Sequence, residues 1–288
     1  MQLSLFTEPR HIIPISGKDS LATALVQTTE RPDLEYEFLF NDTGAELPEV
    51  YEWLDSVATR TGWEIRRIGA SLEAKIQSWN GFLPSIHARY CTKDCKIKPT
   101  DEYLGNDPAF VYYGLRADEE RVGYIPANGS NIQPVYPLRE KQLGIVHVYA
   151  ILEAQGLTPP DFFWQRVYDA VCDRLPSEQW IKLEQWQFKT LFAGRSRANC
   201  YFCFFQRQVE FLWLYETHPS YFEKARGFEK SDFTWLKDHP LSDYDDSKFR
   251  DRVFERHVVK LCNVLIGKSK TSLDSEIART SCGLICGK

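Results

Sequence analysis

Residues 16–20 read Ser-Gly-Lys-Asp-Ser and stand between an apolar segment and a run of helix-forming residues. The apolar segment before them has the character of a short buried strand, and the run after them has the character of a helix. A glycine turn before a helix presents backbone N–H groups and the positive end of the helix dipole to an anion. Lys18 adds a cation, and Ser16 and Ser20 add hydroxyl donors. This combination indicates a phosphate-binding loop, although the spacing of a Walker A loop is absent.

Three further polar clusters follow apolar segments, at 41–46 (NDTGAE), 90–99 (YCTKDCKIKP) and 114–121 (GLRADEER). In a doubly wound sheet, ligands bind outside the carboxyl ends of the strands, so the four clusters are expected at one edge. Arg116 and Arg121 can pair with phosphate or sulfate bidentately, which lysine does less well. The sequence therefore predicts an anion site built from several strand ends.

The order of elements predicts the fold class. Strands are expected at 11–15, 34–42, 63–70 and 109–114, and helices at 19–30, 47–62 and 144–160. This alternation is typical of an α/β fold with a Rossmann-like, mostly parallel sheet flanked by helices. We predict that this domain covers 1–160 and that a helical, cysteine-containing region covers 161–288. The aromatic stretch 162–186 is expected to form core or an interface rather than a base-stacking platform.

Composition restricts the class of protein. The chain has 288 residues, of which 43% are hydrophobic and 26% charged, and its net charge of −5 argues against nonspecific coating of nucleic acid. No apolar run reaches the length of a membrane span, and the first residues lack the features of a signal peptide. We therefore expect a cytoplasmic protein with no membrane partner. There, the eight cysteines are expected to be metal ligands, reactive thiols or core residues.

The ordered motifs resemble a known family. SGKDS resembles the PP-loop of the adenine nucleotide α-hydrolase superfamily, although the family loop usually reads Ser-Gly-Gly-Lys-Asp-Ser and Ser16 stands at a glycine position. Residues 40–54 are similar to the DTG-x-E-x-PE-x-Y segment of the phosphoadenosine phosphosulfate (PAPS) reductase family. The clusters at 90–99 and 114–121, the stretch 134–160 and the NCYFCFFQ segment at 199–206 resemble later parts of that family. The resemblance covers most of residues 11–206 in order.

The resemblance implies a site for ATP with Mg²⁺. Lys18 would neutralise charge at the α-phosphate, Ser16 and Ser20 would donate hydrogen bonds, and Asp19 would hold Mg²⁺ or orient the lysine. The residues implied in catalysis are Lys18, Asp19, Arg116 and Arg121. Those implied in nucleotide binding are Ser16, Gly17, Lys18, Asp19, Ser20, Asp42, Thr43, Gly44, Glu46 and Gly114.

The cysteines allow two schemes. Cys200, Cys203, Cys282 and Cys286 form two close pairs, and four thiolates suit tetrahedral zinc or an iron–sulfur cluster. We prefer this scheme. In the other scheme, Cys91 and Cys95 join Cys200 and Cys203. Cys282 is then free, and its Cys-Gly-Leu context resembles the mobile nucleophile of the sulfonucleotide reductases.

Three functions follow from the resemblance. The preferred one is an ATP pyrophosphatase that cleaves the α–β phosphate bond to activate a substrate for sulfur transfer. It resembles enzymes of DNA phosphorothioation and PAPS reductase-like proteins near CRISPR loci, with a cysteine desulfurase or other sulfur donor and a nucleic-acid-associated complex as expected partners. The first alternative is a PAPS or APS reductase that makes sulfite with Cys282. The second is a catalytically weak nucleotide-binding accessory subunit.

Overall fold

The computed structural model describes residues 8–180, 182–196, 200–230, 233–270, 272–273 and 276. These residues form two compact units. The first unit comprises the described residues up to Lys75 together with Arg89–Pro159. The second unit comprises Ile76–Ala88 and the described residues from Pro160 onward.

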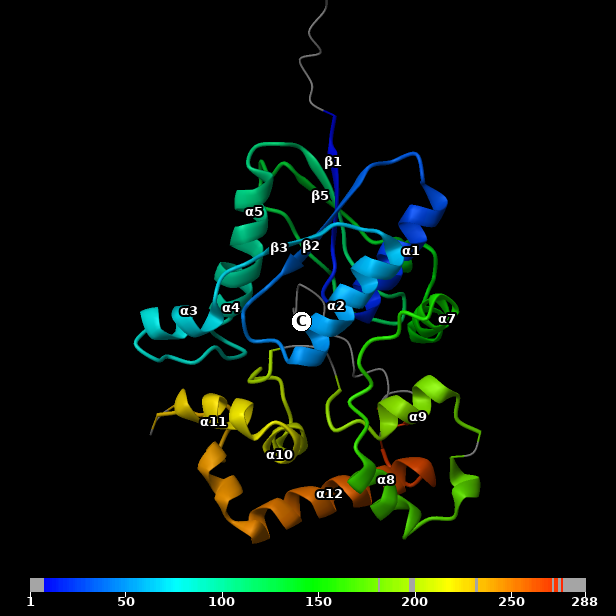
Figure 1. The fold of residues 1–288 in the computed structure, drawn as a ribbon, viewed down its shortest axis with the longest axis vertical. Coiled ribbons are helices and arrows are strands. Elements are labelled where there is room, and N and C mark those ends of the chain that lie inside the picture. Colours follow the sequence, from blue (N-terminus) through cyan, green and yellow to red (C-terminus); the bar gives the residue numbers. More distant parts are fainter. Residues whose placement is uncertain are drawn as a thin grey trace, which may run out of the picture. The chain divides into compact units, whose positions relative to one another are not determined.

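The first unit is built on a five-stranded parallel sheet in the order β3-β2-β1-β4-β5 (Figure 1). The chain runs outward from β1 to β2 and β3, then crosses back to β4 on the other side of β1 and continues to β5, so the strand order reverses between β1 and β4. Such a switch point opens a crevice at the carboxyl edge of the sheet. The strands are β1 (Arg10–Pro14), β2 (Tyr36–Asn41), β3 (Ile65–Ile68), β4 (Ala109–Tyr112) and β5 (Ile132–Val135).

Helices cover both faces of this sheet. Ile12, Leu39 and Val111 alternate with residues of the opposite face and pack with Leu104 of α5 (Lys98–Leu104) into one buried cluster. In Figure 1, α5 lies on one side of the strands, and α1 and α7 lie on the other. The helices of this unit are α1 (Lys18–Glu30), α2 (Pro48–Thr61), α3 (Leu72–Ser78, which runs into the second unit), α4 (Tyr90–Thr92), α5, α6 (Pro137–Glu140) and α7 (Ile145–Gln155).

The predicted α/β fold with a parallel sheet is confirmed, and the sequence signals act at the expected places. Pro48 opens α2, and Gly62 ends it in the left-handed conformation with φ 72°, which glycine adopts without a steric cost. The sequence analysis missed β5. This strand is four residues long and contains Pro134, which cannot donate to a sheet ladder and is tolerated here because β5 is an edge strand.

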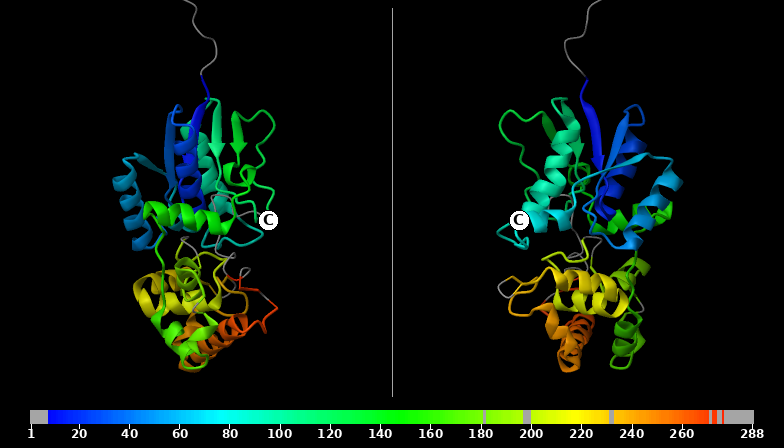
Figure 2. Two further views of the ribbon diagram at one scale, coloured as in Figure 1. Left: turned by 90° about the vertical axis from the view of Figure 1, so that its right-hand side faces the viewer. Right: turned by 60° about the vertical axis from the view of Figure 1, so that its left-hand side comes forward.

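The second unit is helical, as predicted for the C-terminal portion. Phe162, Trp164, Trp180 and Trp186 are each at most 8% exposed, so the expectation that the aromatic stretch contributes core is confirmed for these side chains. Figure 2 shows the helices of this unit from two sides. They are α8 (Gln165–Cys172), α9 (Gln185–Leu191), α10 (Gln208–Thr217), α11 (Pro219–Gly227) and α12 (Ser247–Leu265).

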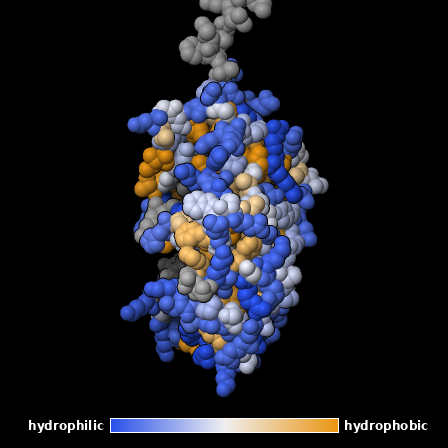
Figure 3. All heavy atoms as spheres, turned by 90° about the vertical axis from the view of Figure 1, so that its left-hand side faces the viewer, coloured by the Kyte–Doolittle hydropathy of each residue, from blue (hydrophilic) through white to orange (hydrophobic). Residues whose placement is uncertain are grey.

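The surface agrees with the ordinary composition. On the face shown in Figure 3, hydrophilic residues predominate and apolar residues appear as separate patches. Within the described ranges, every helix is too short or too polar to cross a membrane.

Candidate functional site

The loop 16–20 leaves the central strand β1 and enters α1 at the switch point. Gly17 has an extended backbone with φ 172°, and a Cβ atom added there would meet nothing within 4 Å. The Ser20 hydroxyl accepts hydrogen bonds from the N–H groups of Ser16 (2.9 Å) and Gly17 (3.1 Å) and donates one to the Gly17 carbonyl (2.9 Å). Ser20 therefore fixes the loop at the start of the helix. The Ser16 hydroxyl is buried and forms no hydrogen bond with the described residues, so it can donate to a ligand.

Lys18 and Asp19 are buried as a pair at the start of α1. Their side chains are 7% and 6% exposed, and the Lys18 Nζ lies 3.4 Å from the Asp19 Oδ2. Burial lowers the pKa of Lys18, and the nearby charge of Arg116 lowers it further. The Asp19 carboxylate opposes both effects by stabilising the charged ammonium group. An anionic ligand would oppose them in the same way.

Arg116 holds three carboxylates together and is only 1% exposed. Its guanidinium lies 3.0 Å from Asp19 Oδ1, 2.7 Å from Asp118 Oδ1 and 3.0 Å from Glu119 Oε1. Burial opposes the charge, but the three carboxylates raise the pKa of Arg116 above its ordinary value. The other oxygen of Asp118 accepts a hydrogen bond from the N–H of Ile145 (3.0 Å), the first residue of α7. Arg116 therefore joins the segment after β4 to the starts of α1 and α7.

Gly114 is required because the chain passes directly against α1. A Cβ atom at this position would lie 2.5 Å from the Ser20 nitrogen and 2.6 Å from the Asp19 carbonyl carbon. Both neighbours are backbone atoms, which cannot rotate away as a side chain would. Gly114 therefore serves the packing between two backbone segments, and its predicted role in nucleotide binding stays a prediction.

The segment after β2 is fixed by Asp42. Its Oδ1 accepts hydrogen bonds from the Gly44 N–H (2.8 Å) and the Tyr51 hydroxyl (2.8 Å), and Gly44 adopts φ 68°, which favours glycine. Burial and the Asp42 carboxylate raise the pKa of Tyr51, so its hydroxyl stays protonated and donates. The Thr43 hydroxyl lies 3.4 Å from the Glu46 Oε1. Since β2 is the neighbour of β1, this segment shares the carboxyl edge of the sheet with loop 16–20.

Sequence reasoning emphasised the arginines of 114–121 and overlooked the acidic residues between them. Glu119 also pairs with Arg121, whose side chain is 23% exposed. The signal was present in the sequence, because Asp118 and Glu119 follow Arg116 closely enough to neutralise it. Asn41 was missed as well: it is 2% exposed, its Oδ1 accepts from the Thr100 hydroxyl at 3.2 Å, and its Nδ2 forms no hydrogen bond with the described residues.

Cys91 and Cys95 belong to the first unit; Cys91 lies in α4, and Cys95 lies within the π-helical turn Lys93–Ile97 that follows. Cys95 is completely buried, and burial raises its pKa to about 11; burial also raises the pKa of Cys91. Burial therefore favours the neutral thiol form of both groups. The Cys95 carbonyl accepts from the N–H of Ala70, which joins this turn to the end of β3 (3.3 Å).

The Cys200-x-x-Cys203 pair lies in the second unit, and Cys282 and Cys286 lie outside the described residues. The Cys200 carbonyl accepts from Arg195 (2.8 Å), from the Gln206 side chain (3.1 Å) and from the Cys203 N–H (3.1 Å). In the described part of the chain, no group of three or more histidine, cysteine or acidic side chains could hold a metal ion. The four-cysteine centre remains a prediction.

Comparisons with known proteins bear on the first unit. Residues 10–127 match the family model described as the phosphoadenosine phosphosulfate reductase domain, which supports the resemblance for this stretch. An uncharacterized protein of Methanocaldococcus jannaschii is 24% identical over 214 residues, covering 72% of this chain and 44% of the relative. The chain thus spans less than half the length of that relative. A crystal structure of PAPS reductase from Candida auris with phosphate aligns at a TM-score of 0.39 and 17% identity, covering 57% of this chain and 78% of that one.

Glu210, near the Cys200 segment, generates a pH-dependent prediction. Burial opposes its charge, but Arg207 and the hydrogen bonds from Ser196 lower the pKa of Glu210 to about 2. A folded pKa below the ordinary 4.5 stabilises the protein above about pH 4.5, and this stabilisation is lost as the pH falls toward 2. At 1.36 kcal/mol per unit, the full contribution is about 3 kcal/mol. We expect Glu210→Gln to lower the free energy of unfolding by about this amount at pH 6 and by less than half of it near pH 3, where part of the stabilisation remains.

Urea unfolding at both pH values measures this difference. Glu223→Gln is the control, because Glu223 pairs with Arg226 at an exposed position of the same unit. A Glu210→Gln deficit that is equal at pH 6 and pH 3 would contradict the assignment.

Proposed function

We propose that the carboxyl edge of the first unit binds an adenine nucleotide and cleaves its α–β phosphate bond to activate a substrate for sulfur transfer. The observation that carries the proposal is the position of loop 16–20, between the end of central strand β1 and the start of α1, at the switch point of a parallel sheet. Such a position presents backbone N–H groups to a ligand in the crevice. The match of residues 10–127 to the PAPS reductase domain supports a nucleotide ligand.

Individual residues would divide the work as follows. Lys18 would pair with the phosphates, the Ser16 hydroxyl would donate to them, and Gly17 would allow their close approach because no neighbouring atom fills the space beside it. Ser20 would hold the loop in shape through its three hydrogen bonds. Arg116 would act as a positioning residue, because its contacts are with carboxylates at the base of the loop.

The charges at the site favour a nucleotide that carries a bound Mg²⁺ ion. Both oxygens of Asp19 already face cations, Arg116 at 3.0 Å and Lys18 at 3.4 Å, so Asp19 fits the role of orienting the lysine better than that of a Mg²⁺ ligand. The basic groups Lys18, Arg116 and Arg121 are all paired with carboxylates. The protein therefore offers little excess positive charge to a triphosphate, and we propose that the nucleotide binds as its Mg²⁺ complex, in which the metal neutralises part of the phosphate charge.

Lys18→Ala tests the binding step. A hydrogen bond to a charged partner is worth about 1.5–3 kcal/mol, so we expect the affinity for ATP with Mg²⁺ to fall roughly tenfold to a hundredfold. Isothermal titration calorimetry measures the change. Lys141→Ala is the matched control, since Lys141 is an exposed lysine paired with Glu30. Wild-type affinity in a folded Lys18→Ala variant would refute the placement of the phosphates.

Product analysis separates the proposed reaction from the reductase alternative. With ATP labelled at the γ-phosphate, we expect the label in pyrophosphate, because cleavage falls between the α- and β-phosphates. Label recovered only as orthophosphate would indicate another class of ATPase. Release of sulfite from PAPS in the presence of a dithiol reductant would instead identify a reductase.

We further propose that Cys200, Cys203, Cys282 and Cys286 bind one zinc ion or iron–sulfur cluster, and that the sulfur-transfer substrate belongs to DNA phosphorothioation or a related defence pathway. Cys282→Ser and Cys286→Ser are each expected to reduce the metal content of anaerobically purified protein, because structural metal binding needs every ligand. Metal analysis and visible absorbance provide the readout. Cys172→Ser is the control, as Cys172 ends helix α8 outside both pairs. Full metal content in both tail variants, with loss of sulfite production alone, would support Cys282 as a nucleophile instead.

A further inference from the structure

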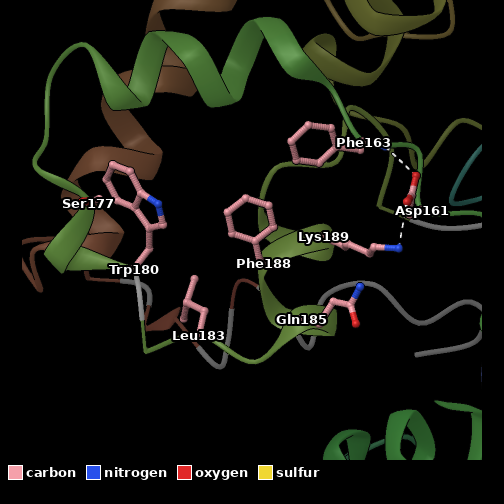
Figure 4. Close-up of a pocket in the computed structure, with 8 residues that line it drawn as sticks. All are labelled: Asp161, Phe163, Ser177, Trp180, Leu183, Gln185, Phe188 and Lys189. Atoms are coloured by element: carbon pink, nitrogen blue, oxygen red, sulfur yellow. Dashed lines mark hydrogen bonds and ion pairs between the residues drawn. The ribbon is translucent and has the colours of Figure 1, made fainter.

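The second unit contains an aromatic pocket that the proposed reaction does not use. It has a volume of about 700 Å³, within the size range of small-molecule sites. Figure 4 shows Phe163, Trp180, Leu183 and Phe188 around it. Phe163 precedes α8, Trp180 and Leu183 lie between α8 and α9, and Phe188 belongs to α9. All the lining residues belong to the second unit, so the pocket is complete without any residue of loop 16–20.

Neighbouring aromatic rings pack against the aromatic wall of the pocket. The rings of Phe163 and Phe188 are nearly parallel, with an interplanar angle of 18° and centroids 5.8 Å apart. The Tyr168 ring meets the Phe188 ring in a T-shaped arrangement, with the two centroids 5.4 Å apart. The Phe192 ring packs against Phe188 with a centroid distance of 5.0 Å. Trp180 is 5% exposed and meets Phe192 edge-on. Such a preformed apolar wall can receive a flat ring without first ordering its own side chains.

One edge of the pocket is polar and carries both signs of charge. The Lys189 Nζ lies 3.2 Å from an Asp161 oxygen, and the other oxygen of Asp161 accepts from the Phe163 N–H at 3.2 Å (Figure 4). Gln185 lies one helical turn before Lys189 on α9, and its side-chain amide supplies a further donor and acceptor. This edge offers hydrogen-bond donors beside acceptors, with no net charge.

We propose that this pocket binds a nucleobase. The aromatic wall favours a flat ring, and the mixed edge matches a ring whose rim carries N–H donors beside carbonyl or ring-nitrogen acceptors. A phosphate group is disfavoured because Lys189, the one cation among the described residues that line the pocket, is already paired with Asp161. A purely hydrocarbon ligand would leave Asp161, Gln185 and Lys189 unused. The proposal stands apart from the ATP site, because a free nucleoside lacks the phosphates that loop 16–20 would hold.

Titration with adenosine, guanosine, cytidine and uridine tests the proposal, with binding followed by saturation-transfer NMR on the full chain. Loss of a stacked aromatic ring weakens the binding of a base by about fivefold to a hundredfold, so we expect Phe188→Ala to weaken binding of the preferred nucleoside at least about fivefold. Gln185→Ala is a second variant that removes an exposed side chain and therefore leaves the fold intact. It is expected to change the preference among the four nucleosides.

Two controls make the outcome decisive. Phe233→Ala removes an aromatic side chain of the same unit outside the pocket, with 39% of its surface exposed, and is expected to leave nucleoside binding unchanged. Free phenylalanine and tryptophan serve as ligands that have an aromatic ring but are not nucleosides. The proposal is overturned if no nucleoside binds, if binding is insensitive to Phe188→Ala and Gln185→Ala, or if the amino acids bind in place of the nucleosides. A nucleoside that loses binding only in Lys18→Ala would be bound at the ATP site instead.

Discussion

The rest of the first unit's site depends on the ion pairs that the buried guanidinium of Arg116 forms. The guanidinium neutralises Asp19 at the start of α1 and Glu119 in the segment after β4, both nearly buried, and it holds Asp118 where its second oxygen caps α7. Removing one partner of a buried ion pair typically costs about 3–5 kcal/mol, because the remaining charge is left without compensation. Here the loss of Arg116 would remove a cation from three carboxylates at once, although Asp19 would keep its pair with Lys18 and Glu119 its pair with Arg121. The chemistry of loop 16–20 is therefore built on an electrostatic centre that lies behind the loop.

The backbone reinforces this centre. The segment after β4 reaches Asp19 only because Gly114 passes the α1 backbone where a Cβ atom would come within 2.5 Å of the Ser20 nitrogen. Ser20 in turn bonds to the backbone of Ser16 and Gly17 and sets the shape of the loop. Charge, backbone packing and a hydroxyl cap thus act on the same few residues. A change in any one of them would therefore disturb the others.

Much of this architecture could be predicted from the sequence, and the failures have physical causes. Loop 16–20 was recognisable because glycine, lysine and serine between a strand and a helix are unusual in a simple turn. β5 was not, because Pro134 interrupts the strand pattern and only the sheet shows that this position is an edge. The role of Arg116 was missed as well. A sequence shows that arginine can bind phosphate, but only the structure shows that its donors are already used by carboxylates.

The compensated charges also bear on how the site would work. With Lys18 buried against Asp19, a phosphate would have to compete with a carboxylate for the same ammonium group, and burial already disfavours the charged form of that group. A ligand whose phosphates carry a bound metal ion would compete with the carboxylate at a smaller cost in free energy. The metal would attract the nearby carboxylates, which repel a metal-free phosphate. The same arrangement would weaken the binding of free anions such as inorganic phosphate. Selectivity for a metal-bound nucleotide over simple anions can therefore arise from the charge balance of the loop, before any contact with the base is considered.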